Sequence, residues 1–241
     1  MNAVLCGANG AMGKLIAGIL KDELKGSVSI DGENGVPRTF EELGEVKADV
    51  VIDFSHHTAV ADVLSYSKKI GAAAIIGTTG HTEEEKALIY AAAKEIPVFY
   101  SGNMSLGIAV LCRLAKDAAR YFPDADIEIV EVHHNRKVDA PSGTAHMLFN
   151  ALKEVRPNAV EHCGRAGEGK RSPDEIGVSS LRMGGVVGVH EVHICTATQS
   201  LTLRHDAMTR GMLADGAVDA AQFMVNKGKG LYGMNDLLAE V

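Results

Sequence analysis

The sequence predicts an α/β protein, with an N-terminal Rossmann-like dinucleotide-binding domain and a following α+β domain that contains an open mixed or antiparallel sheet. In the first hundred residues, short apolar runs alternate with helical patterns. This alternation is typical of a parallel sheet with helices on both faces. After Asn103, longer runs follow in which apolar and charged residues largely alternate. Such alternation indicates a sheet that is covered on one face and open on the other.

The expected elements of the first part are short. Strands are predicted over residues 3–6, 28–30, 49–54, 73–76 and 97–100. Residues 12–24 carry apolar side chains at helical spacing, which predicts the first helix. A later helix is expected to begin at Thr82, because Glu85 lies three residues further on and completes a capping-box pattern.

The second part is predicted to contain a helix over about 106–121 and strands over 127–133, 178–183, 191–197 and 201–205, with a charged, glycine-rich loop over 164–174. A final helix, about 214–225, returns the chain to the first domain. We therefore predict a dinucleotide-binding domain formed by residues 1–104 and 212–241, and a substrate-binding and oligomerisation domain formed by residues 105–211. Hinges are expected near Asn103–Ser105 and Arg210–Ala214, where the chain passes from one predicted domain to the other.

Composition narrows the class of protein. Hydrophobic residues make up 46% and charged residues 23%, which is ordinary for a globular protein. A net charge of −7 argues against a nucleic-acid or membrane-surface partner. The four cysteines are far apart and form no C-x-x-C pair, so we expect reduced, mostly buried thiols rather than a zinc site or disulfides. No secretory signal or membrane span is predicted, and we expect a cytoplasmic protein.

A glycine-rich turn follows the first predicted strand. Gly7, Gly10 and Gly13 stand at the spacing G-x-x-G-x-x-G, a variant of the dinucleotide fingerprint. Gly7 permits the tight turn, Gly10 lets the backbone approach a diphosphate, and Gly13 lets helix and strand pack closely. The helix start then offers N–H groups to the diphosphate. A tight turn that needs glycines and binds nothing is the alternative interpretation.

An acidic residue after the second strand is expected to bind the adenine ribose of the cofactor. Asp31 holds that place, and Glu33 is the rival. No arginine follows immediately; the nearest downstream is Arg38. Since a carboxylate repels a 2′-phosphate, the sequence favours NADH and leaves NADPH possible.

The segment from Glu131 to Ala145 is the candidate catalytic region. It passes from a strand into a polar loop with four cationic or protonatable residues in five positions, and then into a helix start at 141–144. Such a combination attracts anions, and His133 or His134 could donate a proton. No metal site is expected, because adjacent histidines leaving a strand point to opposite sides and no carboxylate or cysteine stands at a ligand spacing. A purely structural basic loop is the other interpretation.

This segment resembles a known family signature. The run E-V-H-H-N-R-K-V-D-A-P-S-G-T-A at 131–145 is similar to the E-x-H-H-x-x-K-x-D-A-P-S-G-T-A signature of the dihydrodipicolinate reductases. Companion motifs follow the family order across nearly the whole chain: V-I-D-F-S at 51–55, G-T-T-G at 77–80, N-M-S-x-G at 103–107, R-x-G-x-x-V-G-x-H at 182–190 and H-x-A-x-x-R at 205–210. One departure is Val189, where family members often carry Glu.

The resemblance implies the site residues. His133 would exchange the proton, Lys137 would be the second catalytic residue, and His134, Gly143 and Thr144 would bind the substrate carboxylates. The residues implied to contact the dinucleotide are Gly7, Ala8, Asn9, Gly10, Ala11, Met12, Gly77, Thr78, Thr79, Ser101, Gly102, Asn103 and Met104.

The implied activity is the NAD(P)H-dependent reduction of 4-hydroxy-tetrahydrodipicolinate to tetrahydrodipicolinate in lysine and diaminopimelate biosynthesis. The implied cofactors are NADH, NADPH or both, and the implied assembly is a homotetramer. Two other functions stay open at this stage. One is a two-domain dehydrogenase with another substrate, such as an amino-acid or sugar dehydrogenase. The other is a non-catalytic NADH sensor, although we find no basic helix-turn-helix in the sequence.

Overall fold

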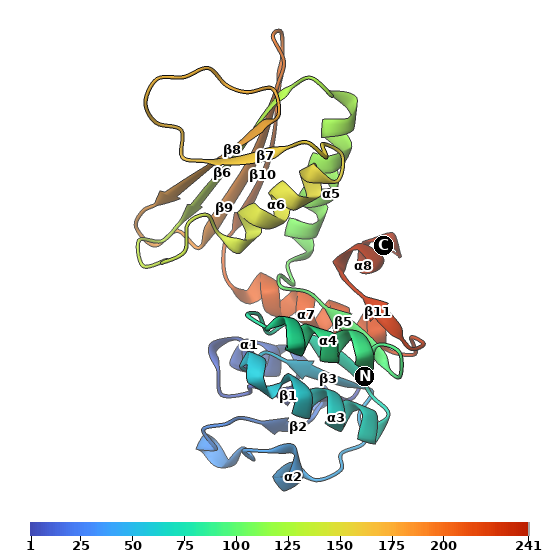
Figure 1. Cartoon of the computed structure of the whole chain (residues 1–241). Coiled ribbons are helices and arrows are strands. Elements are labelled where there is room, and N and C mark those ends of the chain that lie inside the picture. Colours follow the sequence, from blue (N-terminus) through green and yellow to red (C-terminus); the bar gives the residue numbers. More distant parts are fainter. Residues whose placement is uncertain (241) are drawn as a thin grey trace. The chain divides into compact units, whose positions relative to one another are not determined.

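The computed structural model describes residues 1–240, which form two compact units (Figure 1). One unit comprises Met1–Leu106 together with the chain from Gly211 onward, and the other comprises Gly107–Arg210. We call them unit 1 and unit 2. The predicted fold class is confirmed, since unit 1 contains a parallel sheet with helices and unit 2 contains a mixed sheet.

Unit 1 contains a six-stranded sheet in the order β11-β5-β4-β3-β1-β2. All of its neighbouring strands pair in parallel. The strands are β1 (Ala3–Cys6), β2 (Leu24–Val28), β3 (Val50–Asp53), β4 (Ala73–Ile76), β5 (Pro97–Tyr100) and β11 (Gly230–Tyr232). The strand order reverses between β1 and β3. In open α/β sheets, ligands bind at the carboxyl ends of the strands beside such a reversal.

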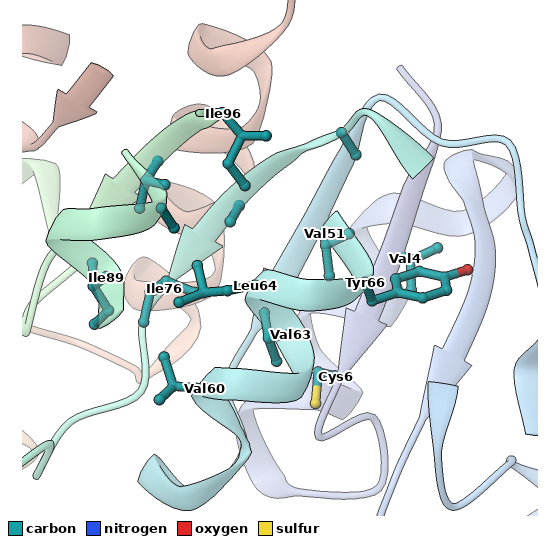
Figure 2. Close-up of a cluster of buried hydrophobic side chains, with 14 of the residues drawn as sticks. Val4, Cys6, Val51, Val60, Val63, Leu64, Tyr66, Ile76, Ile89 and Ile96 are labelled. Atoms are coloured by element: carbon teal, nitrogen blue, oxygen red, sulfur yellow. The ribbon is translucent and has the colours of Figure 1, made fainter. Parts of the chain in front are cut away.

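Helices pack on both faces of this sheet. Val4 of β1 and Val51 of β3 join a buried cluster with Val63 and Leu64 of α3 (Val60–Ile70) and with Ile89 of α4 (Glu83–Ala92) (Figure 2). On the opposite face lie α1 (Ala11–Leu20) and α7 (Gly211–Met224), which contact each other. The shorter elements of unit 1 are η1 (Lys21–Glu23), η2 (Glu33–Gly35), α2 (Phe40–Leu43), η3 (His57–Ala59) and α8 (Met234–Ala239).

Unit 2 contains a five-stranded mixed sheet in the order β10-β9-β6-β8-β7. Its strands are β6 (Asp126–His133), β7 (Val160–Cys163), β8 (Glu175–Arg182), β9 (Gly188–Cys195) and β10 (Ser200–Ala207). β6 pairs in parallel with β8 and antiparallel with β9. The helices α5 (Leu106–Tyr121) and α6 (Gly143–Lys153) cover one face, where Ile127 and Ile129 of β6 join Leu148 of α6 in a second buried cluster.

Several sequence predictions need correction. The first helix ends at Leu20 rather than near residue 24, because Lys21 takes a left-handed φ of 49° and breaks the helical path. The second strand therefore runs over Leu24–Val28 and not over 28–30. β7, β11 and α8 are short, and the sequence pattern did not predict them. The capping box of α4 at Thr82 and Glu85 is confirmed.

The cysteines also differ in part from expectation. All four are free, but only Cys6 is buried, while Cys163 and Cys195 are exposed. The prediction of mostly buried thiols is therefore wrong for these two. Among residues 1–240, no helix is both long enough and apolar enough to cross a membrane.

Candidate active site

The glycine turn of unit 1 forms a tight backbone cradle at the carboxyl end of β1. Gly7 has a φ of +86°, and a Cβ at this position would overlap the carbonyl oxygen of Phe54. A Cβ at Gly13 would overlap the carbonyl oxygen of Gly7. Gly10 precedes the first residue of α1, and this helix has no side-chain cap and no acidic residue in its first turn. The cradle thus fits a dinucleotide, since backbone can approach a diphosphate at an uncapped helix start.

The other predicted cofactor segments lie at the same sheet edge. Gly77 follows β4, and a Cβ there would run into the ring of Phe54, which follows β3. Thr78 is buried, and its hydroxyl accepts a hydrogen bond from the Ser55 N–H at 2.9 Å. The N–H of Ser101, just after β5, donates to the Ile76 carbonyl at 3.2 Å. The glycine turn, the 77–79 turn and the 101–104 segment are therefore brought together by the parallel strands.

The acidic candidate Asp31 is tied to the glycine turn. Its Oδ1 accepts hydrogen bonds from Asn9 Nδ2 at 2.6 Å and from the Glu33 N–H at 3.1 Å. These two hydrogen bonds, Asn9 first, lower the pKa of Asp31. Glu33 takes part through its backbone. Arg38 is close to Asp31 in the structure, although it does not follow Asp31 immediately in the sequence. Its Nη2 lies 3.4 Å from the Asp31 carbonyl oxygen, and its side chain passes over Gly32.

In unit 2, a buried carboxylate contacts the candidate proton donor. Glu131 and His133 point to the same face of β6, and Glu131 is fully buried. His133 Nδ1 lies 2.5 Å from Glu131 Oε2. Arg182, at the end of β8, donates from Nη1 to Oε2 at 3.0 Å and from Nη2 to Oε1 at 2.7 Å. Burial raises the pKa of Glu131, but the hydrogen bonds from Arg182 and its other neighbours outweigh burial and leave this pKa below its ordinary value.

The loop after β6 places the remaining charged candidates. Lys137 Nζ donates to both carboxylate oxygens of Asp139, at 2.8 and 2.9 Å. This pairing lowers the pKa of Asp139. The pKa of His134 is also lowered, first by desolvation and then by the guanidinium of Arg136. His134 Nδ1 is buried without a hydrogen-bond partner, so this ring favours its neutral form.

The start of α6 lies against the same cluster. Ser142 caps the helix, since its hydroxyl accepts from the Ala145 N–H at 3.2 Å, and its own N–H donates to Glu131 Oε1 at 3.2 Å. Gly143 and Thr144 form the first turn, which has no acidic residue. A Cβ at Gly143 would meet open space. The Ser142 N–H is already bonded to the Glu131 carboxylate, and binding of a substrate anion at this helix start stays a prediction.

A carboxylate and two histidines lie close together in unit 2, so the sequence prediction that no carboxylate stands at a ligand spacing is wrong. Ligand atoms of Glu131, His133 and His190 lie within 4.8 Å of one another, so a carboxylate does stand beside the histidine. However, both Glu131 oxygens accept hydrogen bonds from Arg182. A cation at this point would be repelled by the guanidinium and would have to displace it, so the donor set fits Arg182 better than a metal ion.

The structure thus gathers the predicted site residues into two sets. Gly7–Met12, Asp31, the 77–79 turn and the 101–104 segment lie at one edge of the unit 1 sheet. His133, His134 and Lys137 lie with the α6 start in unit 2. Four further residues belong to these sets but were not assigned by sequence: Phe54, Glu131, Arg182 and His190. The spacing of Glu131 and His133 on a strand could have revealed that pair, whereas no local pattern could place Arg182 or His190 beside it.

Comparison with known proteins agrees with this geometry. A glycine cradle on a parallel sheet, in a chain whose N-terminal part matches a reductase family, places the protein among the pyridine-nucleotide-binding oxidoreductases. The family model "Dihydrodipicolinate reductase, N-terminus" matches residues 1–104, and "Dihydrodipicolinate reductase, C-terminus" matches residues 107–238. The chain belongs to the dihydrodipicolinate reductase family, which confirms the resemblance seen in the sequence.

Individual relatives match over nearly their whole length. A 4-hydroxy-tetrahydrodipicolinate reductase of Caldanaerobacter subterraneus subsp. tengcongensis is 43% identical, covering 98% of this chain and 97% of the relative. One from Methanospirillum hungatei is 40% identical, covering 99% and 98%.

Two solved structures are similar in fold. The dipicolinate-bound dihydrodipicolinate reductase of Paenisporosarcina sp. TG-14 has a TM-score of 0.76 at 24% identity, covering 98% of both chains. An amine dehydrogenase of Mycobacterium smegmatis has a TM-score of 0.66 at 15% identity, covering 98% of this chain and 95% of the other. At these identities the likeness concerns the fold alone.

The buried His190 predicts a pH-dependent stability. Desolvation, followed by the neighbouring His133, lowers the pKa of His190 from 6.5 to about 4. Between pH 4 and 6.5, the imidazole of His190 is mainly protonated in the unfolded chain and mainly neutral in the folded chain. Stability is therefore fully present above pH 6.5 and falls as the pH drops towards 4, by up to about 1.4 kcal/mol per pH unit from this residue.

The variant His190→Asn is therefore expected to lose less stability than the wild type over this range. Urea unfolding followed by circular dichroism between pH 8 and 4.5 measures the difference. At pH 8 the imidazole of His190 is neutral in both the folded and the unfolded chain. The difference in unfolding free energy between the two proteins at this pH is therefore the pH-independent cost of the substitution. Parallel stability curves for the two proteins would show that His190 contributes nothing to the pH dependence.

Proposed function

We propose that this protein reduces 4-hydroxy-tetrahydrodipicolinate to tetrahydrodipicolinate, the step of lysine and diaminopimelate biosynthesis that its family carries out. The observation that carries this proposal is the buried Glu131 carboxylate, which holds His133, the α6 start and, through Arg182, the loop that carries Lys137. The family matches both parts of the chain. The bound dinucleotide supplies the hydride. The residues of this chain bind the substrate, orient it and deliver the proton.

His133 is the proposed proton donor. Its Nδ1 is occupied by Glu131, so its Nε2 is the ring atom left to face a substrate. When the substrate gains electron density after hydride addition, a proton from Nε2 neutralises it. Histidine side chains are suited to this exchange, because an imidazole can both bind and release a proton near neutral pH.

Lys137 and the α6 start are the proposed binding sites for the substrate's negative charges. Lys137 pairs with the carboxylate of Asp139, which supports a carboxylate-binding role for its ammonium group. We propose that a substrate carboxylate competes with Asp139 for Lys137. The N–H groups of Gly143 and Thr144, together with His134, then orient the second carboxylate.

Cofactor preference depends on Asp31 and Arg38. Oδ1 of Asp31 is held by Asn9, which leaves its second oxygen as an acceptor for ribose hydroxyls, as in NADH. Arg38 lies beside the same residue and offers a cation to a 2′-phosphate, as in NADPH. We therefore propose that both dinucleotides are used, with NADH favoured by the carboxylate.

Substitution of the catalytic pair tests the proposed function. We expect His133→Gln and Lys137→Ala each to lower kcat by about 100-fold or more, because each removes a group that acts on the reacting substrate. NADH affinity, measured by calorimetry, should be nearly unchanged. Turnover is followed as loss of NADH absorbance with freshly generated cyclic substrate.

Two substitutions on the outer side of α6 serve as controls for this test. His146→Gln and Lys153→Ala change the same residue types at exposed positions, and we expect wild-type turnover from both. Wild-type turnover from His133→Gln and Lys137→Ala as well would remove these two residues from the chemistry.

Cofactor preference gives a second prediction. Asp31→Ala is expected to raise the KM for NADH about tenfold, the effect of roughly 1.4 kcal/mol of lost interaction, with a smaller effect on NADPH. Arg38→Ala is expected to raise the KM for NADPH and to spare NADH. Glu33→Ala should change neither value if Asp31 is the ribose partner. Loss of NADH affinity in Glu33→Ala alone would assign the contact to Glu33.

We also propose that the protein is a homotetramer and that it acts in the cytoplasm. The sheet face opposite α5 and α6 carries Val130 and Val132 of β6, Val189 of β9 and the 44% exposed Leu181 of β8. Pairing between subunits would cover these apolar side chains. Light scattering is expected to give four times the 25.5 kDa subunit mass, and a monomer mass would contradict the assembly. The four free cysteines support a reducing compartment.

A further inference from the structure

Glu131 places a buried carboxylate directly beside the proposed proton donor, His133. It is fully buried at the site end of β6, where a charged group is costly unless each oxygen has partners. Four groups supply these partners: Arg182 Nη1 at 3.0 Å, Arg182 Nη2 at 2.7 Å, the Ser142 N–H at 3.2 Å and His133 Nδ1 at 2.5 Å. The carboxylate is therefore fixed in place before any substrate binds.

Arg182 makes this arrangement rigid. Its guanidinium binds Glu131 through two parallel hydrogen bonds, a geometry that allows little rotation of either group. Nη2 also donates to the carbonyl oxygen of Asp139 at 2.6 Å, which ties the loop that carries Lys137 to the sheet. One side chain thus holds both the carboxylate beside His133 and the loop of the second catalytic candidate.

We propose that Glu131, held by Arg182, is a positioning residue that fixes the His133 ring with Nδ1–H donated to its carboxylate and Nε2 left for the reacting proton. This proposal rests on the function proposed above, and it adds a residue to which the family signature assigned no role. In the proposed step, the Nε2–H bond of the imidazolium breaks and its proton passes to the reduced substrate. The ring is left neutral, with its remaining proton on Nδ1 and bonded to Glu131.

The opposite side of the His133 ring is kept open by a glycine. A Cβ at Gly188 of β9 would lie 3.2 Å from His133 Nε2, so any side chain here would crowd the atom that exchanges the proton. His190, two residues further along β9, packs against the ring edge with centroids 5.1 Å apart. The ring is thus held by Glu131 on one nitrogen and kept accessible at the other.

The charged groups around His133 determine the expected pH profile. Glu131 on the same strand is negative, Arg182 on β8 is positive, and His190 on β9 is neutral above its pKa of about 4. In the loop, Lys137 is paired with Asp139. Replacing Glu131 by Gln removes the negative charge that stabilises the imidazolium and leaves Arg182 unneutralised. Both changes make the protonated ring less stable.

The test compares Glu131→Gln with the wild type. We expect kcat to fall at least about 10–100-fold, the cost found when a partner that orients a metal-binding histidine is lost, with the KM for NADH unchanged. The alkaline fall of kcat should shift to lower pH. The second measurement is ¹⁵N NMR of substrate-free protein with labelled histidines, in which the His133 signals are assigned by their absence in His133→Gln. In the wild type, the neutral His133 ring should carry its proton on Nδ1. In Glu131→Gln, this preference should be lost.

Glu191→Gln is the matched control. Glu191 of β9 contacts His193 at the same two-residue spacing, at 2.9 Å, and also pairs with Arg204, but on the opposite face of the sheet. Glu191 is the strand neighbour of Val130 on the face proposed to pair between subunits, so light scattering must first show an unchanged mass. We then expect its kcat and pH profile to equal those of the wild type. An unshifted pH profile in Glu131→Gln, or an Nε2-protonated His133 ring in the wild type, would overturn the proposal.

A second pair of variants leaves the Glu131 network intact. Gly188→Ala should lower kcat by crowding Nε2 of His133, whereas Gly185→Ala, whose Cβ meets open space, should not. Equal activity of these two variants would contradict the assigned direction of the ring. The NMR result needs no turnover, so an inactive wild-type enzyme would refute the proposed function while leaving the positioning of His133 measurable.

Discussion

The arrangement of unit 2 depends on a single buried negative charge at the end of β6. A carboxylate that loses all contact with water must be compensated by hydrogen-bond donors, and Glu131 obtains these from β8, from the start of α6 and from its own strand. Each partner is thereby drawn to the same point. The buried pair of Glu131 and Arg182 connects the sheet, the loop after β6 and the cap of α6, so the candidate site is built around an electrostatic requirement of folding.

Unit 1 satisfies a different constraint, the close approach of backbone to backbone. At Gly7 and Gly13 a side chain would overlap a carbonyl oxygen, and at Gly77 it would overlap the ring of Phe54. These glycines allow the segments after β1, β3 and β4 to approach one another closely. Backbone that is open to close approach at this edge suits a ligand recognised by its phosphates and ribose.

The sequence predicted the features that have a local signature. The fold class, the glycine turn and the capping box of α4 all follow from short-range spacing and were confirmed. The end of α1 was predicted wrongly because Lys21 has a positive φ, which a lysine rarely adopts and which no sequence pattern indicates.

Residues brought together by strand pairing could not be predicted in the same way. Arg182 reaches Glu131 across 51 positions, and His190 reaches Ser142 across 48. Arg38 shows the same limit over a shorter range, because the turn at Gly32 folds it back onto Asp31. Contacts of this kind depend on register and on turn geometry, which a single sequence does not encode in any local pattern.

The discontinuity of unit 1 has a consequence for synthesis of the chain. Unit 2 is continuous, so all of its strands exist once Arg210 has left the ribosome. Unit 1 instead waits for α7, which covers one face of β3, β4 and β5, and for β11, which pairs with the outer edge of β5. Until α7 has been made, the face of β3, β4 and β5 that it covers stays exposed, and this apolar surface makes the nascent chain vulnerable to aggregation.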